Sequence, residues 1–172
     1  TRTAGFATVP QENLTNASAI VSMLLMFIGG SPVGTAGGIK TVTIAVLLIT
    51  ASSMIKNKNE ITVFNRSIHQ KAVKKAIAVC SLSFGIMFVS TILLSCVTNA
   101  PLIDILYETI SATATVGLTR NLTATLNVWG KLIIIATMYL GRVGPISLAL
   151  VLNVKKENWN TVKIPYEEIN IG

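Results

Sequence analysis

The feature that most restricts the fold of this chain is an apolar run over residues 17–55, interrupted in its middle by GGSPVGTAGGIKT at positions 29–41. As one straight helix the run would be about 58 Å long, whereas the apolar core of a bilayer is about 30 Å thick. The interruption divides it into a shorter piece, 17–28, and a longer piece, 39–55. Because irregular backbone at membrane depth is tolerated only inside protein or beside water, we expect the break to face one of these.

The composition is that of a membrane protein. Hydrophobic residues make up 51% of the 172 residues and charged residues only 12%, whereas soluble domains have about 25% charged residues. The first residues, TRTAGF, look like the middle of a structured segment, so we expect the chain to be the C-terminal half of a longer protein. A helix would hold Cys80 and Cys96 about 24 Å apart, so no disulfide is expected between them.

Four further segments follow the broken run. Residues 56–75 are polar and basic, residues 76–98 form an uncharged stretch that suits one transmembrane helix, and residues 127–153 form the last apolar span. Residues 101–113 are too short to cross a bilayer, since a helix of that length measures about 20 Å. They predict a re-entrant helix, whose first turn carries Asp104, where a negative charge complements the helix dipole.

Basic residues predict the orientation in the membrane. The 56–75 loop holds six Lys and Arg residues, and the tail 155–172 adds Lys155, Lys156 and Lys163. By the positive-inside rule the loop and the C-terminus are cytoplasmic, and the net charge of +7 is mostly this topological signal. The loop lacks interleaved aromatic residues and lies between spans, so no nucleic-acid partner is expected.

A Thr-x-Gly pattern occurs twice, each time before an apolar span. One copy covers residues 3–6, and the other, at 115–119, directly follows the predicted re-entrant helix. The predicted repeat is therefore span, re-entrant helix, Thr-x-Gly segment, span. A single copy of this pattern would be interpreted as a turn in a loop. Glycine lets the backbone turn its carbonyl groups toward an axis, and rings of carbonyls can replace the hydration shell of a cation.

Four stretches together resemble one family: TRTAGF, GGSPVGTAGGIKT, TATVGLTR, and LGRVGP in the last span. They look like the TrkH/KtrB/HKT superfamily of cation transporters, and the ending PYEEINIG is similar to its bacterial KtrB branch. The resemblance implies an all-α membrane protein in which repeated helix–pore loop–helix (M1-P-M2) units surround a pore. Residues 1–55, with the span broken at 29–38, would belong to a third pore unit, and residues 76–154 would be the complete fourth unit.

The resemblance also implies a function. The chain would be the pore-forming subunit of a bacterial K⁺ uptake system in the inner (plasma) membrane, with several spans and no enzymatic activity. K⁺ would bind the carbonyls of a selectivity filter made here by Thr3, Ala4, Gly5, Phe6, Thr115, Val116, Gly117 and Leu118. An intramembrane loop below the filter would gate the pore, and the residues implied are Gly29, Gly30, Ser31, Pro32, Gly34, Thr35, Ala36, Gly37, Gly38, Lys40 and Arg142.

Partners and cofactors follow from the same resemblance. The family implies a homodimer embedded in membrane lipid on a cytosolic KtrA-like ring, and ATP or ADP would bind that ring. No cofactor is expected in this chain, K⁺ is the permeant ion, and Na⁺ acts as an activator in this branch. With only two filter segments present, the choice between K⁺ and Na⁺, the choice between the KtrB and TrkH branches, and the oligomeric state stay open.

Two basic residues have two interpretations each. Arg142 lies near the centre of the last span, where an arginine costs about 2.5–3.5 kcal/mol on insertion scales. It is expected either to face the aqueous path or to be tied to backbone carbonyls for structure alone. Lys40 either takes part in gating or extends its ammonium group toward cytoplasmic water. Residues 34–41 nearly match a phosphate-binding loop, but Ile39 replaces its second glycine, so ATP hydrolysis is not expected.

A second class of function is an ion-coupled secondary symporter, in which a discontinuous helix binds solute at the membrane midplane. The doubled Thr-x-Gly segment argues against it, because such a site does not need a ring of carbonyls. A third interpretation, a structural membrane anchor, leaves Arg142 and the break at 29–41 unexplained.

Overall fold

The computed structural model describes residues 5–30, 37–56, 62–63 and 66–143, and the elements below belong to these residues. They are η1 Gln11–Asn13, α1 Asn16–Phe27, α2 Thr41–Ile55, β1 Thr62–Val63, β2 Arg66–Ser67, α3 Gln70–Val97, α4 Leu102–Thr113, α5 Leu122–Thr125 and α6 Val128–Val143. The predicted helical class is confirmed. The sequence analysis did not foresee the antiparallel pair β1–β2 in the basic loop or the single turn α5.

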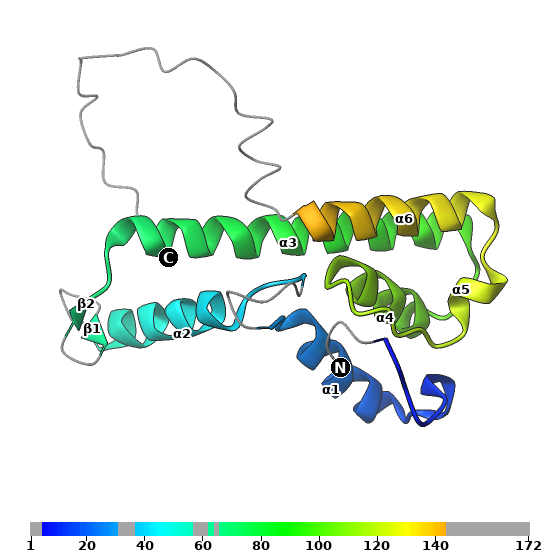
Figure 1. The fold of residues 1–172 in the computed structure, drawn as a ribbon, viewed down its shortest axis with the longest axis horizontal. Helices are drawn as coiled ribbons and strands as arrows, with labels where there is room; N and C mark the ends of the chain where they lie inside the picture. Colours follow the sequence, from blue (N-terminus) through cyan, green and yellow to red (C-terminus); the bar gives the residue numbers. More distant parts are fainter. Residues whose placement is uncertain (1–4, 31–36, 57–61, 64–65, 144–172) are drawn as a thin grey trace, which may run out of the picture.

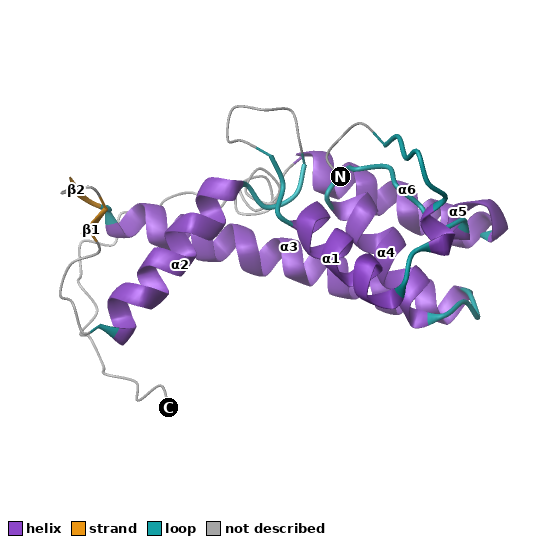
Figure 2. Cartoon of the chain, turned by 90° about the horizontal axis from the view of Figure 1, so that it is seen from below, coloured by secondary structure: helices purple, strands orange, loops and turns teal. Residues whose placement is uncertain are grey.

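The longest helix, α3, is the element along which the others are arranged (Figure 1). α2 packs on its first half and α6 on its second half, both running in the opposite direction to α3. α4 packs against α3 and α6, and α1 packs on α4. Figure 2 shows the same division from below, with α2 at one end of the molecule and α1, α4 and α6 gathered at the other.

α3 contains most of the predicted span 76–98 but begins earlier, at Gln70, inside the segment predicted as loop. His69 caps this start, because its Nδ1 accepts a hydrogen bond from the Lys71 N–H at 3.2 Å. The lysines and alanines that follow are good helix formers, so the helix extends past the apolar boundary. Judged by length and composition alone, α3 is the one described helix able to cross a membrane, and α1 and α2 are shorter apolar helices.

α4 is the most enclosed helix, with eight of its twelve residues buried. Tyr107 joins a core cluster with Met26 of α1 and Met87 of α3, whereas Ile105 joins a second cluster with Leu94 of α3. Large apolar side chains lie on the outer faces of the other helices, among them Phe84 and Phe88 of α3. The short helix predicted at 101–113 is thus a central packing element. Its end determines where the Thr-x-Gly segment 115–119 begins.

Candidate functional site

The two Thr-x-Gly segments meet at their glycines. A Cβ placed on Gly5 would lie 3.2 Å from the Val116 carbonyl oxygen, and one placed on Gly117 would lie 3.6 Å from the Cα of Gly5. Both glycines are left-handed, with φ of +68° and +87°, a conformation that glycine adopts without the steric cost that other residues meet. At this point the backbones of the two segments face each other.

The end of α4 holds the start of the second segment. The N–H groups of residues 114–116 donate to the carbonyls of Ile110, Ala112 and Ser111 at 2.9, 3.1 and 2.9 Å. These bonds satisfy carbonyls that the last turn of a helix otherwise leaves without partners. The C-cap Ala114 and the first two residues of the segment therefore have their amides fixed to α4.

Alternate side chains anchor the rest of this segment. Val116 and Leu118 are only 4% and 7% exposed and belong to the core cluster around Tyr107, while Gly117 between them is exposed. In the first segment the side chain of Phe6, which corresponds to Leu118, is 91% exposed. Among the described residues, the second segment is thus the better anchored of the two.

The break between α1 and α2 is closed by its own backbone. The Gly29 N–H donates to the Ile39 carbonyl at 2.7 Å, and the Ile39 N–H donates to the Phe27 carbonyl at 3.3 Å, which makes a parallel bridge. Ile39 is 1% exposed. The helices end at Phe27 and resume at Thr41, so the break is slightly longer than the predicted 29–38. The bridge pairs backbone groups that would otherwise be unpaired at membrane depth.

The far end of the break lies against the second Thr-x-Gly segment. The Gly37 N–H donates to the Thr115 hydroxyl at 3.0 Å. Gly38 is left-handed, with φ of +73°, and a Cβ there would lie 3.3 Å from the Cβ of Ala114. Thr115 itself has φ of +54°, which is unusual for a β-branched residue. The predicted gate and the predicted filter are therefore in direct contact.

α6 approaches the same point from the other side. A Cβ on Gly141 would overlap the Thr113 carbonyl group and lie 3.2 Å from the Thr113 Cα, so the two backbones touch. The next residue, Arg142, is exposed and lies in the last described turn of α6, and Lys40 is the half-buried N-cap of α2. The structure thus brings Arg142 to the end of α4 where the second segment begins.

Several predicted residues lie outside the described residues. They are Thr3 and Ala4 of the filter, Ser31, Pro32, Gly34, Thr35 and Ala36 of the gate, residues 144–154 at the end of the predicted last span and fourth pore unit, and the tail 155–172.

A cavity of about 330 Å³ opens beside the glycine contact. Its lining comes from the two Thr-x-Gly segments and from the residues after the first of them, namely Gly5, Ala7, Thr8, Val9, Pro10, Gln11, Gly117, Leu118 and Thr119. Within the described part of the chain, no group of three or more His, Cys, Asp and Glu side chains could hold a metal ion. The oxygen atoms of the residues that line this cavity belong to backbone carbonyls, to the hydroxyls of Thr8 and Thr119 and to the Gln11 amide.

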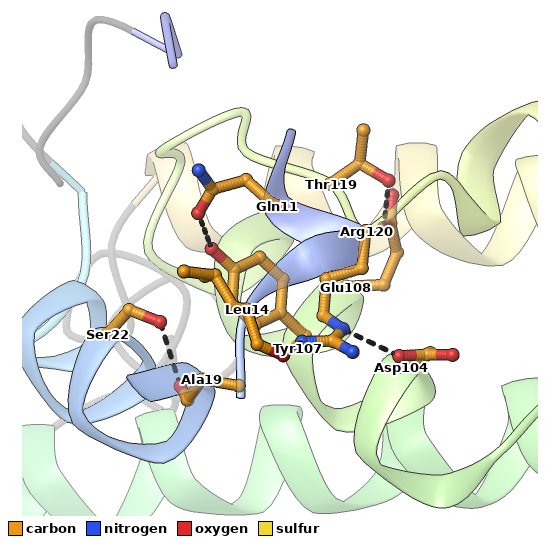
Figure 3. A network of polar contacts seen from close by, with 9 residues as sticks. All are labelled: Gln11, Leu14, Ala19, Ser22, Asp104, Tyr107, Glu108, Thr119 and Arg120. Atoms are coloured by element: carbon orange, nitrogen blue, oxygen red, sulfur yellow. Dashed lines mark hydrogen bonds and ion pairs between the residues drawn. The ribbon is translucent and has the colours of Figure 1, made fainter. Parts of the chain in front are cut away.

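Side chains of α4 form hydrogen bonds and an ion pair with residues in or next to the two segments that line this cavity, and the sequence did not predict these contacts (Figure 3). The Tyr107 hydroxyl donates to Gln11 Oε1 at 2.8 Å. Arg120 forms an ion pair with Asp104 at 2.7 Å and donates to the Leu14 carbonyl at 3.3 Å. The sequence predicts for Asp104 only a role as complement to the helix dipole, because its partner lies sixteen residues away in sequence.

Sequence reasoning also missed Glu108 as a candidate functional residue. It is 4% exposed, and its carboxylate accepts hydrogen bonds from the hydroxyls of Thr119, at 2.7 Å, and Thr123. The signal was present in the segment PLIDILYETI, where a carboxylate stands in the middle of a short apolar helix. A buried carboxylate needs partners, and these two hydroxyls supply them.

This arrangement belongs to a known family. The family model TrkH, described as "Cation transport protein", matches residues 1–164, so the chain is a member of that family. The solved structure of the potassium transporter TrkH from Vibrio parahaemolyticus shares its fold, with a TM-score of 0.72 and 20% identity over 88% of this chain and 34% of that chain.

Individual relatives are more similar in sequence. The Ktr system potassium uptake protein B of Bacillus subtilis is 37% identical over 99% of this chain and 38% of its own length. The potassium/sodium uptake protein NtpJ of Enterococcus hirae is 38% identical over 99% of this chain and 39% of its own length. The chain thus spans less than two fifths of the length of these relatives.

These comparisons confirm the resemblance that the sequence motifs carry and the predicted class, a helical membrane protein. The relatives are named as transport proteins, in agreement with the expectation that the chain is not an enzyme. The family and the fold support a membrane location, which also accounts for the apolar outer faces of the helices.

Proposed function

We propose that the chain forms part of the ion path of a bacterial potassium uptake protein, with residues 3–6 and 115–118 in its selectivity filter. One observation carries this proposal: the left-handed glycines Gly5 and Gly117 meet backbone to backbone, and Thr115, two residues before Gly117, contacts the break through Gly37. Carbonyl groups held in this way can replace the hydration shell of a cation. Relatives named as potassium uptake proteins support K⁺ as the ion, and one is named for sodium as well.

The break and Arg142 are the proposed gate. The break contacts the filter segment through Gly37 and Thr115, at 3.0 Å, so its movement would open or close the path directly below the filter. Arg142 follows Gly141, which touches the end of α4. Its positive charge opposes a cation resting below the filter, and donation to carbonyls of the break would favour the closed state. Lys40 belongs to the same proposed gate.

The assembly is part of the proposal. A homodimer in the membrane would rest on a cytosolic ring that binds ATP or ADP, with the basic loop and the C-terminus facing that ring and Na⁺ as activator. The designation "Ktr system" of one relative supports a transporter of several components.

Flux measurements on the full-length transporter in lipid vesicles test this function. Deletion within residues 29–38 and Arg142→Ala should each raise K⁺ flux, because each removes part of the barrier. Lys131→Ala is the matched control, since Lys131 is also an exposed cation of α6 but lies at its other end. Unchanged flux in both gate variants would refute gating, whereas an unaltered transporter that passes no K⁺ would refute the proposed function. Saturable, ion-coupled uptake of an organic solute would instead favour a symporter.

A further inference from the structure

Glu108 is the buried charged residue of α4, whereas the other charged residue of this helix, Asp104, is 23% exposed. The Glu108 side chain is 4% exposed and lies in the interior of the helix. The described ion pair of Arg120 goes to Asp104, one turn earlier, so the described partners of Glu108 are the hydroxyls of Thr119 and Thr123. The proposed filter and gate include none of Glu108, Thr119 and Thr123, although Thr119 lines the cavity beside the two glycines.

The geometry identifies Glu108 as an acceptor at both oxygens. Thr119 donates to Oε2 at 2.7 Å, and Thr123 donates to Oε1. An ionised carboxylate only accepts hydrogen bonds, and bonds to it are about twice as strong as bonds between neutral groups. Since Thr119 ends the Thr-x-Gly segment and Thr123 lies four residues further on, the carboxylate holds the chain at the end of that segment.

The segment is therefore fixed at both ends to one helix. At its start, the N–H groups of residues 114–116 bond to the last turn of α4. At its end, Thr119 bonds back to Glu108, five residues before Thr113, where α4 ends (Figure 3). The carbonyls of residues 115–118 are held between these two attachments.

We propose that Glu108 is a positioning residue that sets ion selectivity by holding Thr119, and thereby the spacing of the carbonyls of residues 115–118. This inference rests on the proposed function. Na⁺ is smaller than K⁺, so a segment released at its far end can contract around Na⁺ and lose discrimination. The coordination offered by carbonyls is what distinguishes the ions in such a filter.

The test compares K⁺, Rb⁺ and Na⁺ fluxes through the full-length transporter in lipid vesicles. Glu108→Gln keeps the size of the side chain but removes its charge, and Thr119→Val removes one donor at an exposed position. Each should lower the K⁺/Na⁺ flux ratio about three- to tenfold, which is less than the full contribution of a hydrogen bond to a charged group, because only the difference between the two ions enters the ratio. Thr119→Ser keeps the hydroxyl and should restore the ratio lost in Thr119→Val.

Two controls separate this effect from general damage. Glu12→Gln removes an exposed carboxylate of η1, and Thr125→Val removes a hydroxyl of α5 that bonds only within its own turn, to the Leu122 carbonyl. Both should keep the ratio of the unaltered protein.

The outcomes are distinct. An unchanged ratio in Glu108→Gln and Thr119→Val would overturn the inference, and so would an equal fall of K⁺ and Na⁺ flux, which a merely structural role predicts. If Glu108→Gln does not fold, Thr119→Val and Thr119→Ser decide the question. An unaltered transporter without cation flux would overturn the proposed function itself, and the inference with it.

Discussion

Thr115→Val tests whether the break is held against the filter segment by the hydrogen bond between Gly37 and Thr115. Valine keeps the shape of threonine but cannot accept the Gly37 N–H, which the hydroxyl accepts at 3.0 Å. Both residues are β-branched, so the strain of a φ of +54° is the same in each, and the substitution isolates the hydrogen bond.

The magnitude follows from the burial of this contact. Gly37 is half-buried, so the net loss is that of an ordinary hydrogen bond, about 1 kcal/mol. Since about 1.4 kcal/mol is a tenfold change in an equilibrium, the population in which the break leaves the filter should rise about fivefold. Amide hydrogen exchange at Gly37 should accelerate by a similar factor, and K⁺ flux should rise with it.

Hydrogen exchange read by mass spectrometry on peptides that cover residues 37–41, with the transporter in lipid nanodiscs, measures the first effect directly. Thr113→Val is the control, because the Thr113 hydroxyl donates to the Thr109 carbonyl inside α4, at 2.7 Å, and does not reach the break. If exchange at Gly37 is the same in Thr115→Val as in the unaltered protein, the bond does not hold the break, and the reasoning fails.

Three further predictions concern the packing around the site. Gly117→Ala places a Cβ at a φ of +87°, which costs about 1–2 kcal/mol. It should lower both the melting temperature and the K⁺/Na⁺ flux ratio. An unchanged ratio would argue against a filter role. Gly141→Ala puts a Cβ into the last turn of α4 and should destabilise by about 1–3 kcal/mol in thermal unfolding, whereas Gly85→Ala, with nothing within 4 Å of the new Cβ, should not. A double-mutant cycle of Arg120→Gln and Asp104→Asn should give a coupling of about 1–2 kcal/mol, since these side chains are only 10% and 23% exposed; additive effects would show that the ion pair does not hold the segment.

The sequence by itself determined the class of protein and the division of the chain. Segment length against bilayer thickness predicts that the run 17–55 is broken and that 101–113 is too short to cross, and the helices α1, α2 and α4 have these lengths. Local chemistry likewise marks Gly5 and Gly117, because a repeated glycine between apolar residues indicates a special backbone conformation, and both are left-handed. Segment length and local backbone conformation depend on neighbouring residues and on the surrounding solvent or lipid, so the sequence alone can predict them.

Only the tertiary structure decided which of these segments meet. The bond from Gly37 to Thr115 and the attachment of Thr119 to Glu108 join residues 78 and 11 positions apart. The sequence likewise does not show that Gly141 allows close packing of two backbones, whereas Gly85 lies in open space. The physical reason is that such contacts depend on how the helices pack around α4, and packing is a property of the whole fold rather than of any one segment.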